Sequence, residues 1–308
     1  MTRAARYMLS IIAVAGIAFA ILFATTQGGA STARLSEMDL PLLVASMLLL
    51  AVALLSRGLI WKVFLGSAEV HIGWRPALIS RSLPILGKYV PGKIWALAGT
   101  ASAVSQSSGS FSRAAVLTMW FQLSVVAGGL MVAAFGVLAL GASLPMTWYT
   151  YAIFCVCAIV VVLALDLPQS RRLLVRLISR ILPGTAGLRL PPLRYAILLG
   201  MVSWLILGGA QLMMLQAIGL DAGLAPVFLQ PLANSVGMLA GFAPGGIGVR
   251  EGVMVGYLSL AGISPATAIV ASGLARLWSL GAEVLVFLVG LILRQYEKAA
   301  DNLETPSR

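Results

Sequence analysis

Long apolar runs, separated by short polar segments, make up most of the chain. Runs of roughly 20 residues are long enough to form helices that cross a bilayer. By this criterion, spanning helices are expected at residues 7–25, 41–55, 114–140, 147–165, 195–219 and 266–293. The first run follows two arginines and is also compatible with a cleaved signal peptide, but its length favours a spanning helix.

Two further apolar segments, residues 84–105 and 224–262, are interrupted by helix-breaking residues. Proline removes a helical hydrogen bond, and glycine lowers helix stability. The breaks consist of Pro91, Gly92, Pro244, Gly245, Gly246, Gly248 and Gly252. Broken backbone is tolerated at membrane depth only where protein covers it or where it lines a cavity. We therefore predict two re-entrant helical hairpins, each of which enters and leaves the membrane on one side.

The composition favours a polytopic membrane protein of the all-α class. Hydrophobic residues make up 60% of the 308 residues, whereas about half of the residues of a soluble domain are apolar. The length allows one membrane domain, which we place at residues 1–298, followed by a polar tail at 299–308. Residues 67–83 mix charged and apolar side chains, which is typical of an amphipathic helix at the membrane surface.

The distribution of charge indicates the orientation in the membrane. The net charge is +11, but the basic residues lie mainly in loops, which indicates contact with anionic lipid and not with nucleic acid. With the N-terminus inside, 16 of the 21 Lys and Arg residues fall on the inner side. We expect a multi-pass protein of the bacterial plasma membrane with both termini in the cytoplasm. The basic loop after residue 165 is expected to form a solvated, lipid-attracting helix.

This orientation makes the first hairpin enter from the cytoplasm and the second from outside. Residues 7–140 and 147–293 then form two halves of opposite orientation, as in many transporters. The breaks also correspond at five pairs of positions: Leu86/Leu239, Tyr89/Phe242, Pro91/Pro244, Gly92/Gly245 and Ile94/Ile247. We therefore predict an inverted repeat whose two breaks meet near the midplane of the membrane.

Three cations, Lys88, Lys93 and Arg250, lie next to the breaks. A Pro-Gly pair suits the start of a helix, and a helix N-terminus offers N–H groups and partial positive charge to an anion. We therefore expect these cations to bind a lipid phosphate. The alternative is that they extend to the lipid headgroups and only anchor the hairpins.

Glu251 and Glu283 are acidic residues in apolar segments, and Arg276 lies on the same predicted helix as Glu283. A charge at the bilayer centre costs about 2.5–3.5 kcal/mol, so each of these groups needs a partner or water. The candidate pairs are Glu251–Arg276 and Arg250–Glu283, which would either close the bundle or gate a lipid path.

Other polar residues suggest little chemistry. Gln211 and Asn234 are expected to hydrogen-bond between helices. His71 is the only histidine, and the sequence has no phosphate-binding loop motif. No catalytic residue, metal or cofactor is therefore expected, although an integral-membrane transferase is a lesser alternative.

The segments Lys88–Trp95 (KYVPGKIW) and Pro244–Gly252 (PGGIGVREG) resemble the two signature motifs of the lysylphosphatidylglycerol synthase transmembrane-region family, also described as a flippase-like domain. The resemblance covers nearly the whole chain and adds Tyr89 and Trp95 to the expected phosphate site. In full-length synthases this domain is described as moving aminoacylated phosphatidylglycerol between leaflets, while a soluble domain makes it. The sequence shows no such soluble domain, so synthase activity is not expected.

The resulting hypothesis is a protein that moves an anionic phospholipid or a polyprenyl-phosphate-linked lipid between leaflets. The alternative is a non-transporting membrane partner of a lipid-linked glycan glycosyltransferase or of a lipid-modifying enzyme. An anionic membrane lipid is the expected partner under both hypotheses, and the oligomeric state stays open.

Overall fold

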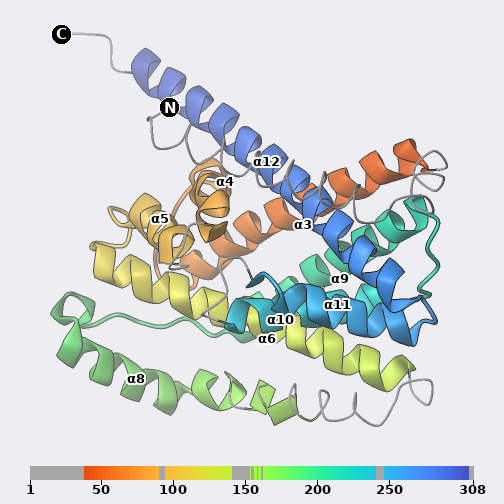
Figure 1. The fold of residues 1–308 in the computed structure, drawn as a ribbon. Coiled ribbons are helices and arrows are strands. Elements are labelled where there is room, and N and C mark those ends of the chain that lie inside the picture. Colours follow the sequence, from red (N-terminus) through yellow and green to blue (C-terminus); the bar gives the residue numbers. More distant parts are fainter. Residues whose placement is uncertain are drawn as a thin grey trace.

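The computed structural model describes residues 38–89, 94–140, 153, 156–157, 159–160, 162–240 and 246–304. Within these ranges all regular elements are helical, which confirms the all-α class (Figure 1). In chain order they are α3 (Leu40–Gly66), α4 (Trp74–Ser82), η1 (Leu83–Tyr89), α5 (Ile94–Val104), α6 (Phe111–Leu140), α8 (Pro168–Ile181), η3 (Pro183–Thr185), α9 (Arg194–Ala217), α10 (Ala225–Leu239), α11 (Val249–Leu260) and α12 (Pro265–Glu304).

Four helices, α3, α6, α9 and α12, are long and apolar enough to cross a membrane. They coincide with four of the six predicted spans, and the protein is a multi-pass membrane protein. The predicted span at 7–25 and most of the one at 147–165 lie outside the described residues. The count of six spans therefore stays a prediction.

Helix α3 is longer than predicted. It begins after Asp39, whose carboxylate accepts a hydrogen bond from the backbone N–H of Leu42 at 2.9 Å, and it continues eleven residues beyond the expected end at Leu55. Apolar side chains follow Arg57, and among them Trp61 is fully buried against Phe121 of α6, with ring centroids 5.0 Å apart. Arg57 therefore lies inside a spanning helix and not in a loop.

The last helix, α12, also exceeds its predicted range of 266–293. It runs to Glu304 as one helix of 40 residues, so the start of the segment expected as a polar tail is helical.

The segment expected as an amphipathic surface helix packs into the bundle instead. Helix α4 contacts both α3 and α12 and buries Ala77, Ile79, Ser80 and Ser82. Small residues allow this packing, because Gly58 of α3 lies against Leu78 and Gly290 of α12 lies against Ser82. One consequence is that Arg81 faces the interior of the protein.

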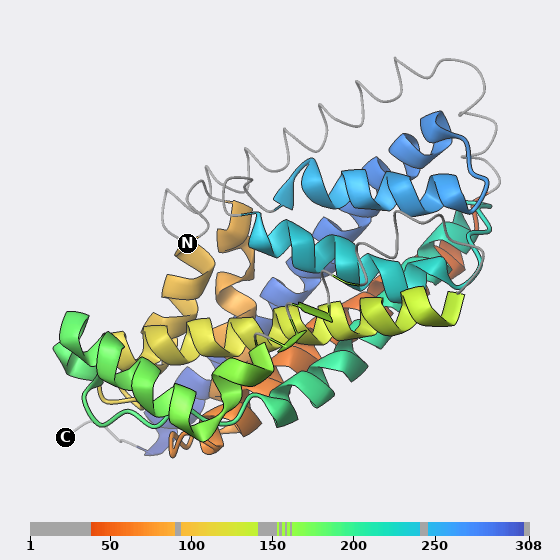
Figure 2. The ribbon, with the colours of Figure 1, turned by 90° about the horizontal axis from the view of Figure 1, so that it is seen from below.

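Each broken segment folds back on itself. In the first, Gly87 lies against Ala96, and Pro84 lies against Gly99, so η1 and α5 run antiparallel. In the second, α10 and α11 pack side by side (Figure 2). The described helices on either side of each break therefore pack together, and a re-entrant path through the membrane stays a prediction.

The two halves of the chain repeat the same order of elements at a constant spacing of 153 residues. This spacing separates Pro91 from Pro244, and it also carries α3 onto α9, α5 onto α11 and α6 onto the first part of α12. The packing is reciprocal, since α4 packs on α12 while α10 packs on α6, and α3 packs against α9. The repeat thus extends well beyond the short breaks that suggested it.

Helix α8 lies along the edge of the bundle, at the bottom of Figure 1. None of its residues is buried, and Leu173, Leu177 and Ile181 are exposed beside four arginines. This confirms a helix in the basic loop, and its attraction to lipid stays a prediction.

Candidate functional site

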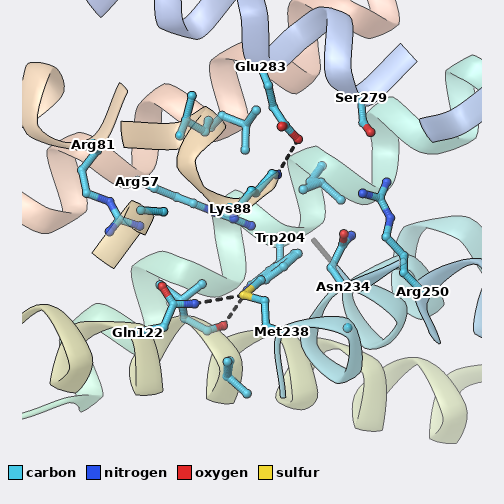
Figure 3. Close-up of a pocket in the computed structure, with 18 of the residues that line it drawn as sticks. Arg57, Arg81, Lys88, Gln122, Trp204, Asn234, Met238, Arg250, Ser279 and Glu283 are labelled. Atoms are coloured by element: carbon cyan, nitrogen blue, oxygen red, sulfur yellow. Dashed lines mark hydrogen bonds and ion pairs between the residues drawn. The ribbon is translucent and has the colours of Figure 1, made fainter. Parts of the chain in front are cut away.

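A cavity of about 490 Å³ lies within the bundle and is lined by both hairpins and all four long helices (Figure 3). Its charged lining residues are Arg57, Arg81, Lys88, Arg250 and Glu283. Much of the remaining wall is apolar, with Leu50, Leu54, Leu97, Leu123, Leu207 and Val286 among its members. Four cations therefore face one carboxylate in an otherwise largely apolar space.

Lys88 and Glu283 form the ion pair of this cavity. The Lys88 Nζ lies 2.6 Å from Glu283 Oε1, and the Glu283 side chain is only 4% exposed. The second oxygen, Oε2, is buried and has no hydrogen-bond partner among the described residues. The candidate pair Arg250–Glu283 is therefore wrong, because η1 places Lys88 beside the Glu283 carboxylate.

Arg57 enters the cavity from the middle of α3. Its Nε donates a hydrogen bond to Ser203 Oγ at 3.3 Å, and its guanidinium lies over the Trp204 ring, 4.0 Å from the centroid. The terminal NH2 group is buried and meets no acceptor in the part of the chain that the structure describes. Sequence reasoning missed this residue, although apolar residues on both sides of Arg57 were a usable signal.

Arg81 and Arg250 complete the cationic lining. Arg81 comes from α4, and its guanidinium lies 5.2 Å from the centroid of the Phe121 ring. Arg250 comes from the second residue of α11, and Figure 3 shows its guanidinium on the side of the cavity near Ser279. The structure thus brings Arg250 and Lys88, one from each hairpin, to the same cavity.

The predicted pair of Glu251 and Arg276 is present, with 3.5 Å between Oε1 and NH1. Glu251 Oε2 also accepts a hydrogen bond from the backbone N–H of Gly248 at 2.7 Å. Helix α11 begins at Val249 and not at Pro244, so its positive N-terminal end is already complemented by this carboxylate. We expected a helix N-terminus at the second break whose N–H groups are open to an anion, and this expectation is therefore wrong.

Tyr89 connects the first hairpin to this pair. Its ring centroid lies 5.1 Å from the Arg276 guanidinium carbon and 5.3 Å from Lys88 Nζ. Arg276 does not line the cavity. It instead contacts Tyr89 of η1 and Glu251 of α11 and so supports the packing of these two elements.

The remaining predicted residues divide into three groups. Gly246 lines the cavity with a φ of +73°, and a Cβ there would lie 3.0 Å from the Gly237 backbone. Trp95, Gly248 and Gly252 do not line the cavity, and Trp95 is 55% exposed. Pro91, Gly92, Lys93, Pro244 and Gly245 lie outside the described residues.

Polar side chains of α6, α9 and α10 also line the cavity. Gln122 Nε2 donates to the sulfur of Met238 at 2.9 Å. Asn234 and Gln211, expected only as interhelical contacts, also line the cavity. Across the described ranges, histidine, cysteine and acidic side chains do not gather in groups of three or more.

Many cavity residues are related by the same spacing of 153 residues. The pairs are Leu54/Leu207, Arg81/Asn234, Pro84/Gly237, Ile85/Met238, Leu97/Arg250, Val125/Trp278 and Val126/Ser279. Equivalent positions of the two halves therefore line the same cavity. Binding sites at the interface of two repeats are typical of secondary transporters.

Comparison with known families gives a match over most of the chain. A family profile described as "Lysylphosphatidylglycerol synthase TM region" matches residues 8–290, a range that includes every residue lining the cavity. No curated protein and no solved structure matches the chain.

Proposed function

Since the chain belongs to the lysylphosphatidylglycerol synthase TM region family, we propose that it moves an anionic phospholipid or a polyprenyl-phosphate-linked lipid between the two leaflets of a membrane. The observation that carries this proposal is the cavity with four cations and one carboxylate. We assign the chain a transport role and no catalytic role.

The energetics of buried charge favour a bound anion. Each cation at membrane depth costs about 2.5–3.5 kcal/mol unless a partner or water compensates it. Glu283 can compensate only one of the four. A lipid phosphate would supply oxygens for the remaining guanidinium groups, which form strong charge-assisted hydrogen bonds with phosphate.

The apolar part of the wall suits the rest of the lipid. The headgroup would occupy the cationic region, while acyl or prenyl chains would stay among apolar side chains and in the bilayer. The two hairpins would enter from opposite sides and open the cavity alternately to each leaflet, as repeats do in alternating access. The sequence has no nucleotide-binding motif, so we propose that a gradient of lipid or of an ion drives the movement.

Cysteine labelling tests the membrane arrangement that this mechanism requires. We propose a bacterial plasma membrane with both chain termini in the cytoplasm. Single cysteines at His71 and Ser107, both exposed, should then react with an impermeant maleimide only from the cytoplasmic side. Cysteines at the exposed positions Asp221 and Ala261 should react only from outside. Labelling of either pair from opposite sides would make that hairpin a true span and would contradict the mechanism.

Lipid exchange in liposomes tests the function itself. Purified protein should accelerate the exchange of an acyl-labelled phosphatidylglycerol between leaflets relative to empty liposomes. Replacement of Arg250 by glutamine should slow this exchange at least about tenfold, because a hydrogen bond to a charged group is lost. The matched control is Arg176→Gln on the exposed helix α8, which removes the same charge outside the cavity.

The outcomes separate the two hypotheses. Equal exchange by the Arg250 and Arg176 variants would remove the cavity from the transport path. No exchange of any anionic phospholipid or polyprenyl-phosphate lipid by the folded protein would refute transport. The alternative, a non-transporting partner of a glycosyltransferase or lipid-modifying enzyme, would then be the hypothesis to pursue.

A further inference from the structure

We propose that lipid enters the cavity sideways from the membrane, through an opening that we call the α6 portal, and leaves through the equivalent place in the other half, the α12 portal. The α6 portal is formed by cavity-lining residues of α5, α6 and α10, namely Leu97, Met119, Leu123 and Leu239. The inference rests on the proposed function and adds the route of the lipid and the contacts that close one end of it.

The α6 portal connects the cavity with the surface of the protein. Met119 and Leu239 line the cavity, yet they are 64% and 53% exposed. Gln122, one turn further along α6, is only partly buried, and Trp204 is fully buried in the same cavity (Figure 3). The wall therefore leads from exposed apolar side chains to the Trp204 ring, over which the Arg57 guanidinium lies.

The position of Met119 along α6 places this opening within the bilayer. The spanning part of α6, Phe111–Ala139, has 29 residues, so it is about 43 Å long and Met119 lies about 12 Å from its start. The hydrocarbon layer is roughly 30 Å thick, so this depth is among lipid chains. An acyl or prenyl chain can therefore lie in the portal while its phosphate reaches the cations. In the proposed orientation the portal faces the inner leaflet.

The equivalent positions of the other half are buried. With the spacing of 153 residues, the α12 portal consists of Leu86, Arg250, Ser272 and Arg276. Ser272, which corresponds to Met119, is 5% exposed, and Leu86, which corresponds to Leu239, is 4% exposed. Two repeats that give access alternately must have one opening closed while the other is open. The two portals differ in this way.

An ion pair closes the α12 portal. Arg276 of α12 contacts Glu251 of α11 at 3.5 Å and the Tyr89 ring of η1, so it joins the two elements on either side of this place. In the α6 portal the positions of Arg276 and Glu251 are taken by Leu123 and Ala98, which cannot form an ion pair. Loss of the pair should therefore shift the protein towards a state in which the α12 portal is open and the α6 portal is closed.

The reactivity of single cysteines at the two portals tests this inference without any transport assay. Met119→Cys and Ser272→Cys are made in a chain whose own Cys155 and Cys157 are replaced by serine, and the purified full-length protein in neutral detergent is treated with N-ethylmaleimide. Met119→Cys should react about tenfold or more faster than Ser272→Cys, because a buried thiol is inert.

The substitution Arg276→Leu, which copies Leu123 of the other half, should reverse this preference. The reaction of Ser272→Cys should become about tenfold faster and that of Met119→Cys slower, because the ion pair is present in only one of the two states. Misfolding would not slow the reaction of Met119→Cys, so the opposite changes identify the switch. The control Arg189→Leu removes an exposed ion pair and should leave both rates unchanged.

A blocking label tests the route of the lipid. A bulky label attached to Met119→Cys through a disulfide before reconstitution should stop the exchange of acyl-labelled phosphatidylglycerol in liposomes, and reduction of the same sample should restore it. The matched control is Leu138→Cys, which is exposed on the same helix but does not line the cavity.

Equal native rates at the two cysteines, or changes in the same direction in Arg276→Leu, would overturn the alternation of the portals. Equal exchange by the labelled Met119 and Leu138 variants would overturn the route. If the native chain exchanges no lipid although the two rates change in opposite directions, the transport function alone is refuted, and the paired portals stand.

Discussion

Replacing Lys88 by methionine should lower the free energy of unfolding by about 3 kcal/mol, because it leaves Glu283 charged and buried without its partner. Loss of one member of a buried ion pair costs roughly 3–5 kcal/mol. We place the expected value at the lower end of this range because the Lys88 side chain is 35% exposed. Equilibrium unfolding in mixed detergent micelles measures the change.

The chain contains a matched control for this substitution. Arg189 and Glu69 are also 2.6 Å apart, but their side chains are 78% and 68% exposed. Replacement of Arg189 by methionine should therefore cost at most about 1 kcal/mol. The double variant Lys88→Met with Glu283→Gln should recover part of the stability that Lys88→Met loses. Similar costs at Lys88 and Arg189 would show that burial does not decide the strength of the pair.

Replacing Gly208 by alanine should also destabilise the protein, by about 1–3 kcal/mol. Gly208 allows α9 and α10 to touch, and a Cβ at this position would overlap the backbone carbonyl of Val227. Backbone cannot rotate away as a flexible side chain can, so the two helices must separate. Because both helices line the cavity, lipid exchange should fall as well.

The neighbouring glycine gives the control for this prediction. Gly209 lies in the same helix, and a Cβ there would have no heavy atom within 4 Å. Gly209→Ala should therefore be neutral or stabilising by up to about 1 kcal/mol, as expected from helix propensity alone. Thermal unfolding followed by circular dichroism compares the two variants. Equal melting temperatures would refute the close contact between α9 and α10.

The apolar pattern of the sequence was sufficient to predict the helical class and the position of four spans, since length and hydropathy determine which segments can cross a bilayer. It was not sufficient for Arg57. A charged residue usually marks the end of a span, whereas the ring of Trp204 and the hydroxyl of Ser203 hold Arg57 within the bundle. Those partners lie almost 150 residues further along the chain, where no local pattern can indicate them.

Proline and glycine act on the backbone at their own positions, which is why the sequence alone could suggest where the helices are interrupted. The partners of the charged residues could be only partly predicted. Glu251 and Arg276 were expected to pair, and they do. Glu283 pairs with Lys88 because η1 packs against α12, and this tertiary contact has no counterpart in the sequence pattern.

The spacing of 153 residues has a consequence for the origin of the binding chemistry. Equivalent positions share a backbone framework but carry different groups: Arg81 corresponds to Asn234, Arg250 to Leu97, and Glu283 to Leu130. Under the proposed transport function, a duplicated scaffold of this kind would have two end states with similar packing and unequal electrostatics. A phosphate would then meet a different electrostatic field in each state. Subsequent divergence of the side chains, and not of the fold, would set the preferred direction of lipid release.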